Sequence, residues 1–474
     1  MENCQVNALF KFFWIIFPII VLLSSIYTII PDLLGFTCLF WYNYCMKKIL
    51  IPIISLCLIF PFFQGRIVSA DSFSVAAKSA IAIDASSGKI LYAQNATDSS
   101  TQIASITKLI TAYIVYQKIS EGKLSWDTKV PISTYAYDLT LNSAASNVKM
   151  TKGETISVKD LMNALMLPSA NSAAVALAEH IAGSEPKFVD MMNAQLKAWD
   201  ITDAKIYNSS GLPNSVLGKN IYPNSSVDAS NTMSAEDVAV VSYHILKDYP
   251  QILDITKQVS LTFDANGSSK ATMQTTNQML KGFPQYRNGV DGLKTGSTGY
   301  QINCFAATTL QNGFRIITVI LEANNPATDN STAFNLTNTL MNHVYGSWTT
   351  NTLVKKGNVY PDFKTFGIVD GKKNAVKLIS ETDIAPVVPM KTDGTPETKN
   401  LTVSTDKNKK DTTEAPVKEG EHLVSVKTSF KDSLGYIPGA SQATFLLVAA
   451  TNVDRSIPLV VIWNHFVNFV NEKL

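Results

Sequence analysis

The distribution of cysteine is the feature that most limits how this 474-residue chain can fold. Four of its five cysteines lie in the first 57 residues, and only Cys304 lies beyond them. A single cysteine cannot form an internal disulfide, so the chain after this leader must be stabilised by a hydrophobic core. Cys304 itself lies in the apolar run 302–307, where a buried strand residue is expected.

The leader has the composition of a secretory signal peptide. A positive start at Met46 precedes the apolar run 49–63, and a small-residue cleavage site ends at Ala70. We therefore interpret residues 46–70 as a signal peptide. The rest of the chain is then exported, to the outer face of the cytoplasmic membrane or the cell wall.

A second apolar stretch, residues 12–30, is long enough to span a bilayer. Because the signal peptide begins at an internal methionine, residues 1–45 are interpreted as an over-extended start. The alternative is a true transmembrane segment that tethers the protein. Both interpretations place the rest of the chain outside the cytoplasm.

Charge and histidine content exclude several function classes. The formal net charge is +2, so no general electrostatic attraction to nucleic acid is expected. The five histidines are scattered and form no H-E-x-x-H motif, so we expect neither a metal nor another cofactor.

Hydrophobic periodicity predicts an α/β (α+β) domain over residues 71–350, with an antiparallel sheet flanked by helices on both faces. Ser169 or Asn171 could cap the third helix. A hairpin is expected at Gln311-Asn312-Gly313. The expected strands are 80–84, 90–92, 290–309 and 314–323, and the expected helices are 105–119, 158–167 and 171–183.

The pattern of apolar and polar residues changes after residue 352. Short apolar runs predict a small β-rich C-terminal domain over 352–440. Within it, residues 390–421 are rich in Lys, Thr, Asp, Glu and Pro, which predicts a disordered insertion or a long loop.

The last segment, 456–474, is predicted to be an amphipathic helix with Trp463 and Phe466 on its apolar face. It can lie on a membrane surface or dock on its own domain, and the lack of basic residues on its polar face weakens the membrane interpretation.

The first candidate for chemistry is Ser105-Ile106-Thr107-Lys108. Three residues apart on a helix, the hydroxyl and the amine lie on one face, one turn apart. A serine needs an adjacent base to become a nucleophile, and burial or a nearby cation can lower the pKa of a lysine enough for that role. Taken alone the S-x-x-K pattern is weak, because it recurs at other serines of the chain.

Two further elements follow in order. Ser169-Ala170-Asn171 comes after a helix stopped by Pro168, and Lys294-Thr295-Gly296-Ser297-Thr298 lies on an expected strand. Gly296, in the stretch that begins at Lys294, would permit close approach by a ligand. Each has an ordinary explanation by itself, as a helix cap or as an exposed strand lysine.

Together, S-x-x-K, S-x-N and K-T-G over about 190 residues are the signature of penicillin-binding proteins and serine β-lactamases. The region from about residue 76 to 346 resembles the D-alanyl-D-alanine carboxypeptidases of the low-molecular-mass penicillin-binding proteins, and the run 208–213 agrees. The signal peptide, the β-rich C-terminal domain and the terminal amphipathic helix also match this layout. The resemblance implies a DD-peptidase/β-lactamase-like fold.

It further implies hydrolysis of the terminal D-alanine from peptidoglycan stem peptides through an acyl-enzyme, with β-lactam antibiotics as covalent inhibitors. By the resemblance, the catalytic residues are the nucleophile Ser105, the base Lys108 and the proton relay Ser169. Asn171 would hold Lys108 and the substrate amide, and Lys294 would set the potential of the cleft. Thr295 would bind the terminal carboxylate. Backbone amides of Ser105 and Ser297 would form the oxyanion hole.

Two positions depart from the family pattern. Ser172 follows Asn171 where the family often has Asp, and no arginine lies between Arg315 and Arg455, where the family often has one that contacts the substrate carboxylate. Either Arg315 takes that role, or Thr295 and Ser297 suffice, or carboxylate binding is weaker.

Three other functions are compatible with some of these features. A class A β-lactamase would need a glutamate that activates the deacylating water, and no convincing E-x-x-L-N box is present. A transpeptidase or endopeptidase would use the same residues. A catalytically silent cell-wall-binding protein would have lost a nucleophile or a base, whereas all three motifs are intact.

Overall fold

The computed structural model describes residues 73–143, 145–263, 270–298, 301–324 and 329–473. From Ser74 to Leu474 the chain forms one compact unit. The proposed signal peptide (46–70) and the segment before it (1–45) lie outside the described residues.

The first domain is built on a five-stranded sheet with the order β2-β1-β9-β8-β7. Every neighbouring pair is antiparallel. This agrees with the expected sheet, although the stretch 290–309 forms two strands rather than one. The strands are β1 (Ala77–Asp84), β2 (Ile90–Gln94), β7 (Val290–Thr298), β8 (Gln301–Gln311) and β9 (Phe314–Ala323).

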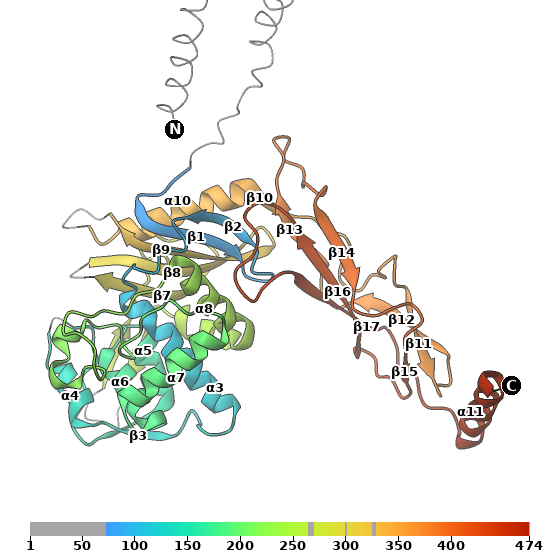
Figure 1. The fold of residues 1–474 in the computed structure, drawn as a ribbon, viewed down its shortest axis with the longest axis horizontal. Helices are drawn as coiled ribbons and strands as arrows, with labels where there is room; N and C mark the ends of the chain where they lie inside the picture. Colours follow the sequence, from blue (N-terminus) through green and yellow to red (C-terminus); the bar gives the residue numbers. More distant parts are fainter. Residues whose placement is uncertain (1–72, 144, 264–269, 299–300, 325–328, 474) are drawn as a thin grey trace, which may run out of the picture. The chain divides into compact units, whose positions relative to one another are not determined.

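Both faces of this sheet are covered, because alternate residues of its central strands are apolar. On one face Phe305 contacts Phe334 of α10, with ring centroids 5.1 Å apart. On the other face Ile81 and Val319 join the main hydrophobic core with the remaining helices. Figure 1 shows α10 on one side of the sheet and α8 on the other. The predicted α/β (α+β) fold class is thereby confirmed.

The helical part surrounds α6, which is buried along most of its length. Its small side chains, mainly alanine, let neighbouring helices approach closely, and Gly183 ends it in a left-handed conformation. The helices of this domain are α3 (Lys108–Ser120), α4 (Thr134–Thr140), α5 (Val158–Met166), α6 (Asn171–Ala182), α7 (Glu185–Ala198), α8 (Ala235–Asp248), α9 (Leu253–Thr256) and α10 (Thr332–Ser347).

The expected cap of α6 is wrong. Its N-cap is Ala170, with no side-chain hydrogen bond. Asn171 instead turns its amide toward Lys108 and toward the carbonyl of Ser146. Ser169 adopts a φ of 65°, which directs the chain away from capping geometry.

The C-terminal domain contains a six-stranded sheet with the order β14-β16-β17-β12-β11-β15 and its own hydrophobic core. β10 pairs with β13 in a separate two-stranded sheet; β10 comes before the six-stranded sheet in the chain, and β13 lies between β12 and β14. The strands are β10 (Trp348–Thr350), β11 (Thr365–Val369), β12 (Ala375–Ser380), β13 (Val387–Pro389), β14 (Leu401–Thr405), β15 (Thr412–Glu414), β16 (His422–Phe430) and β17 (Ala443–Ala449).

The prediction of an unstructured insertion at 390–421 is wrong where β14 and β15 lie. Both are the outermost strands of the sheet, and both are largely exposed or half-buried. A strand at a sheet edge needs few large apolar residues, because backbone hydrogen bonds to one neighbour hold it. The polar composition therefore indicated an edge position rather than disorder.

The last helix, α11 (Pro458–Lys473), follows the C-terminal sheet. His465 Nε2 lies 2.9 Å from Asp370 Oδ2, so the helix touches its own domain through a polar side chain. Its large apolar side chains, among them Ile462, Trp463 and Phe466, are exposed. Among the described residues, no helix has both the length and the apolar composition that crossing a bilayer requires.

A buried lysine joins the turn between β1 and β2 to the C-terminal domain. Lys89 is 1% exposed, and its Nζ donates to Asp432 Oδ1 at 2.7 Å and to Gly435 O at 2.8 Å. The amine also lies over the rings of Trp348 and Tyr436. Ser86 and Lys89 match the S-x-x-K pattern, but this lysine is committed to the domain contact.

We predict that Lys89→Met destabilises the protein by about 2 kcal/mol, because the acceptors around the ammonium lose a charged donor while the aliphatic stem is retained. Urea unfolding measures this change. Lys118→Met is the control, because Lys118 pairs with Glu121 at the surface and should cost under about 0.5 kcal/mol. Equal costs for the two variants would contradict a structural role for the buried contact.

Candidate active site

All seven predicted site residues lie at or beside one cleft between the sheet and the helical part. The cleft has a volume of about 520 Å³, and five of the seven line it directly: Ser105, Ser169, Asn171, Thr295 and Ser297. Lys108 and Lys294 lie immediately behind this lining and are fully buried. Three stretches far apart in the sequence therefore converge on a single crevice.

Ser105 lies in a short 3₁₀ turn, η2 (Ala104–Thr107), which runs directly into α3. Lys108 begins α3, and its Nζ lies 2.8 Å from Ser105 Oγ. The expected juxtaposition of hydroxyl and amine is present, although the serine precedes the α-helix instead of lying inside it.

The amine of Lys108 has two further partners, Asn171 Oδ1 at 2.7 Å and the carbonyl oxygen of Ser210 at 2.6 Å. Burial holds the pKa of Lys108 well below its usual value, and the nearby charge of Lys294 lowers it further. A neutral amine has two N–H donors and one lone pair. Asn171 and Ser210 offer only acceptors, so the lone pair is left to face the hydroxyl of Ser105.

The second motif, Ser169-Ala170-Asn171, supplies two residues that line the cleft, and one of them, Asn171, is also a partner of Lys108. Asn171 also donates through Nδ2 to Ser146 O at 2.9 Å, which fixes the orientation of its amide. Ser169 is 4% exposed, and its Oγ has no hydrogen-bond partner among the described residues. A hydroxyl that is buried, unpaired and at the cleft is available to a ligand or a proton.

The third motif lies on β7. Lys294 Nζ donates to Thr295 O at 3.0 Å and lies 3.5 Å from Thr295 Oγ1. Burial lowers the pKa of Lys294 to about 7. Ser297 is exposed at the cleft, where the register of β7 against β8 shifts between Gly296 and Ser297. Such irregularities re-aim backbone groups next to active sites.

Two glycines let other segments approach the turn that carries Ser105. A Cβ on Gly296 would lie 2.8 Å from Ile103 O, so this glycine lets β7 approach the turn of Ser105. The expectation that it admits a ligand is therefore wrong, because backbone fills that space. Gly211, with a φ of 85°, packs against Ala104 O, where any side chain would overlap that oxygen.

Arg315 is not part of the cleft. It forms a bidentate pair with Asp291, at 2.7 and 2.8 Å, and also donates to Thr308. This removes one of the three explanations for carboxylate binding. Ser172, the other departure, is fully buried, and its backbone N–H donates to Asn147 Oδ1.

Sequence reasoning missed two contributors. The carbonyl of Ser210 belongs to the run 208–213, which had only supported the resemblance, and a backbone acceptor leaves no mark in a motif. Thr276 lines the cleft, and its Oγ1 lies 2.6 Å from Thr295 Oγ1. No residue pattern marked it in advance.

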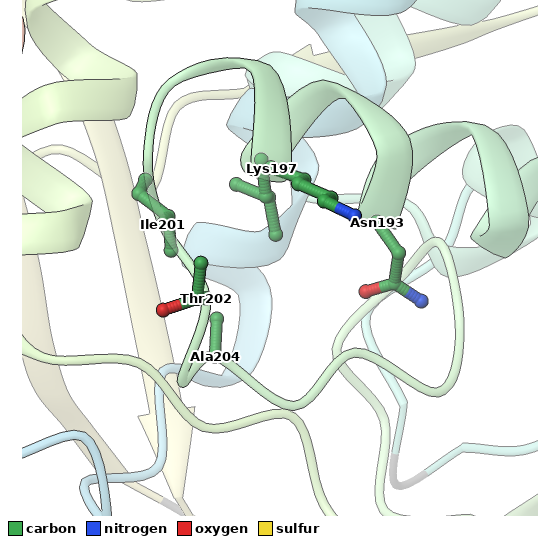
Figure 2. A pocket seen from close by; sticks show the side chains of 6 residues that line it. Asn193, Lys197, Ile201, Thr202 and Ala204 are labelled. Carbon is green, nitrogen blue, oxygen red and sulfur yellow. The ribbon is translucent and has the colours of Figure 1, made fainter.

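A second hollow, of about 370 Å³, lies beside the end of α7 (Figure 2). Its lining is mainly aliphatic and polar, with Lys197 as the one ionisable lining residue. It shares no lining residue with the cleft of Ser105.

An antiparallel sheet and helices that bring a serine, two buried lysines and an asparagine together define the class of active-site serine acyl-transferring enzymes. The sequence profile of D-alanyl-D-alanine carboxypeptidases matches residues 65–325. The chain belongs to this family and is a serine peptidase. A second profile, the C-terminal domain of penicillin-binding protein 5, matches residues 348–455.

Individual relatives agree. The chain is 27% identical to D-alanyl-D-alanine carboxypeptidase DacF of Bacillus subtilis over 73% of this chain and 80% of that protein. It is 32% identical to D-alanyl-D-alanine carboxypeptidase DacC of Escherichia coli, over 53% of this chain and 57% of that protein. A crystal structure titled as a peptidoglycan synthesis regulatory factor (PBP3) from Streptococcus pneumoniae has 40% identity and a TM-score of 0.69, covering 80% of this chain and all of that one.

We predict that Asn171→Asp lowers the acylation rate of Ser105 by an activated ester at least about 100-fold at neutral pH. A carboxylate beside Lys108 favours the ammonium form and raises its pKa, so the neutral base appears only at higher pH. The acylation rate measured from about pH 6 to about pH 10 should therefore keep its amplitude and move to more alkaline pH.

Asn193→Asp is the matched control. Asn193 lines the hollow beside α7, so this substitution adds the same negative charge away from the cleft. It should leave the pH profile unchanged. An unshifted profile in Asn171→Asp would show that the Asn171 amide does not set the protonation of Lys108.

Proposed function

We propose that this serine peptidase removes the terminal D-alanine from peptidoglycan stem peptides through an acyl-enzyme on Ser105. One observation carries the proposal: Lys108 Nζ lies within hydrogen-bond distance of Ser105 Oγ, Asn171 Oδ1 and Ser210 O. In the neutral form of the amine, its two N–H groups donate to Asn171 Oδ1 and Ser210 O, and its lone pair faces Ser105 Oγ. That is the arrangement a general base needs in order to take the proton of a nucleophile.

In the acylation step, Ser105 Oγ attacks the penultimate D-alanine carbonyl carbon while its proton passes to Lys108 Nζ. The carbonyl oxygen becomes an oxyanion, which would accept hydrogen bonds from the backbone N–H groups of Ser105 and Ser297. One such donor is typically worth about 3 kcal/mol in the transition state. Collapse of this intermediate breaks the peptide bond.

The leaving D-alanine must gain a proton on its nitrogen. Ser169 Oγ is buried at the cleft and has no other hydrogen-bond partner in the described part of the chain, so it can relay the proton from Lys108. Water then enters, attacks the ester carbonyl, and regenerates Ser105 with release of the shortened peptide.

Lys294 and Thr295 would hold the carboxylate of the terminal D-alanine. Because burial lowers the pKa of Lys294 to about 7, its positive charge is present below that pH and is lost above it in the free enzyme. A bound carboxylate stabilises the ammonium form and raises this pKa again. β-lactam antibiotics, which carry a carboxylate beside a reactive cyclic amide, would acylate Ser105 in the same way.

We predict that incubation with a pentapeptide ending in D-Ala-D-Ala yields a product lighter by one alanine, as detected by mass spectrometry. Ser105→Ala should abolish the product, because it removes the hydroxyl that lies 2.8 Å from the Lys108 amine. Thr107→Ser, two residues further along the same 3₁₀ turn, keeps a hydroxyl and should retain activity. Cross-linked dimer as the sole product would identify a transpeptidase instead.

A fluorescent penicillin distinguishes the remaining alternatives with the same pair of proteins. Lasting label on the wild type that disappears in Ser105→Ala supports a carboxypeptidase. Label shed within seconds indicates a β-lactamase, and a well-folded protein without label indicates a catalytically silent binder.

We also propose that the protein works outside the cytoplasm and that α11 rests on a membrane surface. The leader 46–70 supports export. On α11, His465 contacts the domain through Asp370, whereas Ile462, Trp463 and Phe466 point into solvent. A helix held by its polar face presents its apolar face outward, as an interfacial helix must.

We predict that the protein co-sediments with phospholipid vesicles and that Phe466→Asp weakens this binding at least about 10-fold, because the phenyl ring supplies apolar area and a carboxylate opposes insertion. Asn464→Asp adds the same charge elsewhere on the exposed surface of α11 and should change binding far less. No binding by the wild-type protein would mean that α11 serves another contact.

A further inference from the structure

The substrate carboxylate has to be recognised here without a guanidinium. Among the residues that the structure describes, each arginine is engaged elsewhere. Arg315 pairs with Asp291, Arg287 donates to Asn342 and Gln311, and Arg455 contacts Asp370. None of these lines the cleft of Ser105. The charge that attracts a carboxylate must then come from Lys294, which is set back behind the lining.

The hydroxyl pair of Thr276 and Thr295 lies in front of that lysine. The two Oγ1 atoms are 2.6 Å apart, and both side chains line the cleft. Thr276 follows β6 (Ala271–Gln274), and its backbone N–H donates to Leu167 O at 3.2 Å. The segment that carries Thr276 is thus fixed to the end of α5, and the pair does not depend on β7 alone.

A bound carboxylate sets the direction of this hydrogen bond. Either hydroxyl can donate across the 2.6 Å between the two Oγ1 atoms. A carboxylate in the cleft can only accept, so Thr295 Oγ1 donates to it and accepts from Thr276 Oγ1. The Lys294 amine lies 3.5 Å from the same Thr295 oxygen, and while charged it can only donate.

We propose that Thr276 is a specificity-determining residue of this enzyme: it orients the Thr295 hydroxyl so that this hydroxyl, backed by the Lys294 ammonium, binds the substrate carboxylate in place of a guanidinium. The proposal rests on the proposed function, because it assigns a partner to the carboxylate of the same substrate. It makes Thr276 a positioning residue that acts through Thr295 and leaves the acyl-transfer chemistry at Ser105 untouched.

The test compares Thr276→Val, which keeps the shape without the hydroxyl, with Thr276→Ser, which restores it. Two matched pairs of compounds probe the subsite: a peptide ending in D-Ala-D-Ala and its C-terminal amide, and benzylpenicillin and its methyl ester. Thr276→Val should lower kcat/KM for the acid peptide about 10-fold, since hydrogen bonds to charged groups are the strong ones. It should leave the amide within about 2-fold, and Thr276→Ser should recover most of the loss.

The penicillin pair gives the same ratio for the rate of acylation, without requiring peptide turnover. If the wild-type protein cleaves neither peptide, the proposed function fails, yet the acid-to-ester ratio still reports on Thr276. Equal losses on acid and neutral compounds, or no loss at all, would overturn the inference. If Thr276→Val folds poorly, as judged by acylation with the methyl ester, Thr276→Ala provides the same comparison.

Discussion

The amine of Lys108 is enclosed by the domain, between Ser105 Oγ, Asn171 Oδ1 and Ser210 O. Removing an ammonium from water is costly, so burial lowers the pKa of Lys108, and the second buried lysine, Lys294, opposes protonation further. A neutral amine without partners would also be unfavourable at this depth. The two acceptors, Asn171 Oδ1 and Ser210 O, offset that cost and leave the lone pair of a neutral amine for the nucleophile. Protonation state, orientation and reactivity thus have one physical origin.

These acceptors come from segments that ordinary helix and strand geometry would not bring together. Three backbone positions at the site have a positive φ: Ala104 (46°), Ser169 (65°) and Gly211 (85°). For non-glycine residues such conformations cost about 1–3 kcal/mol each, so the surrounding structure must impose them. Asn208 does part of this, since its Oδ1 accepts from the backbone N–H groups of Ser210 and Gly211. Ala104 and Ser169 thus show that part of the backbone strain in the described chain lies where the motifs meet.

The sequence motifs identified the reactive side chains of the site, but not the residues that position them. The order and spacing of S-x-x-K, S-x-N and K-T-G predicted which side chains converge, because each motif names reactive groups directly. The role of Gly296 was misjudged, because a glycine can admit backbone as well as ligand. Asn171 was expected either to cap α6 or, by the resemblance, to hold Lys108, and the structure shows the contact with Lys108. Ser210 acts through its carbonyl, and Thr276 acts through one hydroxyl. Neither role changes the residue pattern, so only coordinates reveal them.

The same reasoning applies to β14 and β15. Their composition looked disordered because hydrophobic content measures how much of a strand is buried, and an edge strand exposes most of its surface. The neighbouring Ala415 and Val417 are nearly fully buried, so the segment is anchored at a few points. A long polar stretch can therefore be ordered by the backbone hydrogen bonds of its neighbours.

Deacylation is where this cleft departs from a β-lactamase. No carboxyl group is present among the described residues that line it. The water that hydrolyses the acyl-enzyme must then lose its proton to Lys108, the group that earlier took the proton of Ser105. For a peptide this works, because the leaving D-alanine departs and opens the path for water. In a penicilloyl-enzyme the cleaved amine stays covalently attached to the acyl group and cannot leave the cleft. The proposed mechanism, with one base for both half-reactions, therefore favours turnover of peptides over release of a penicilloyl group.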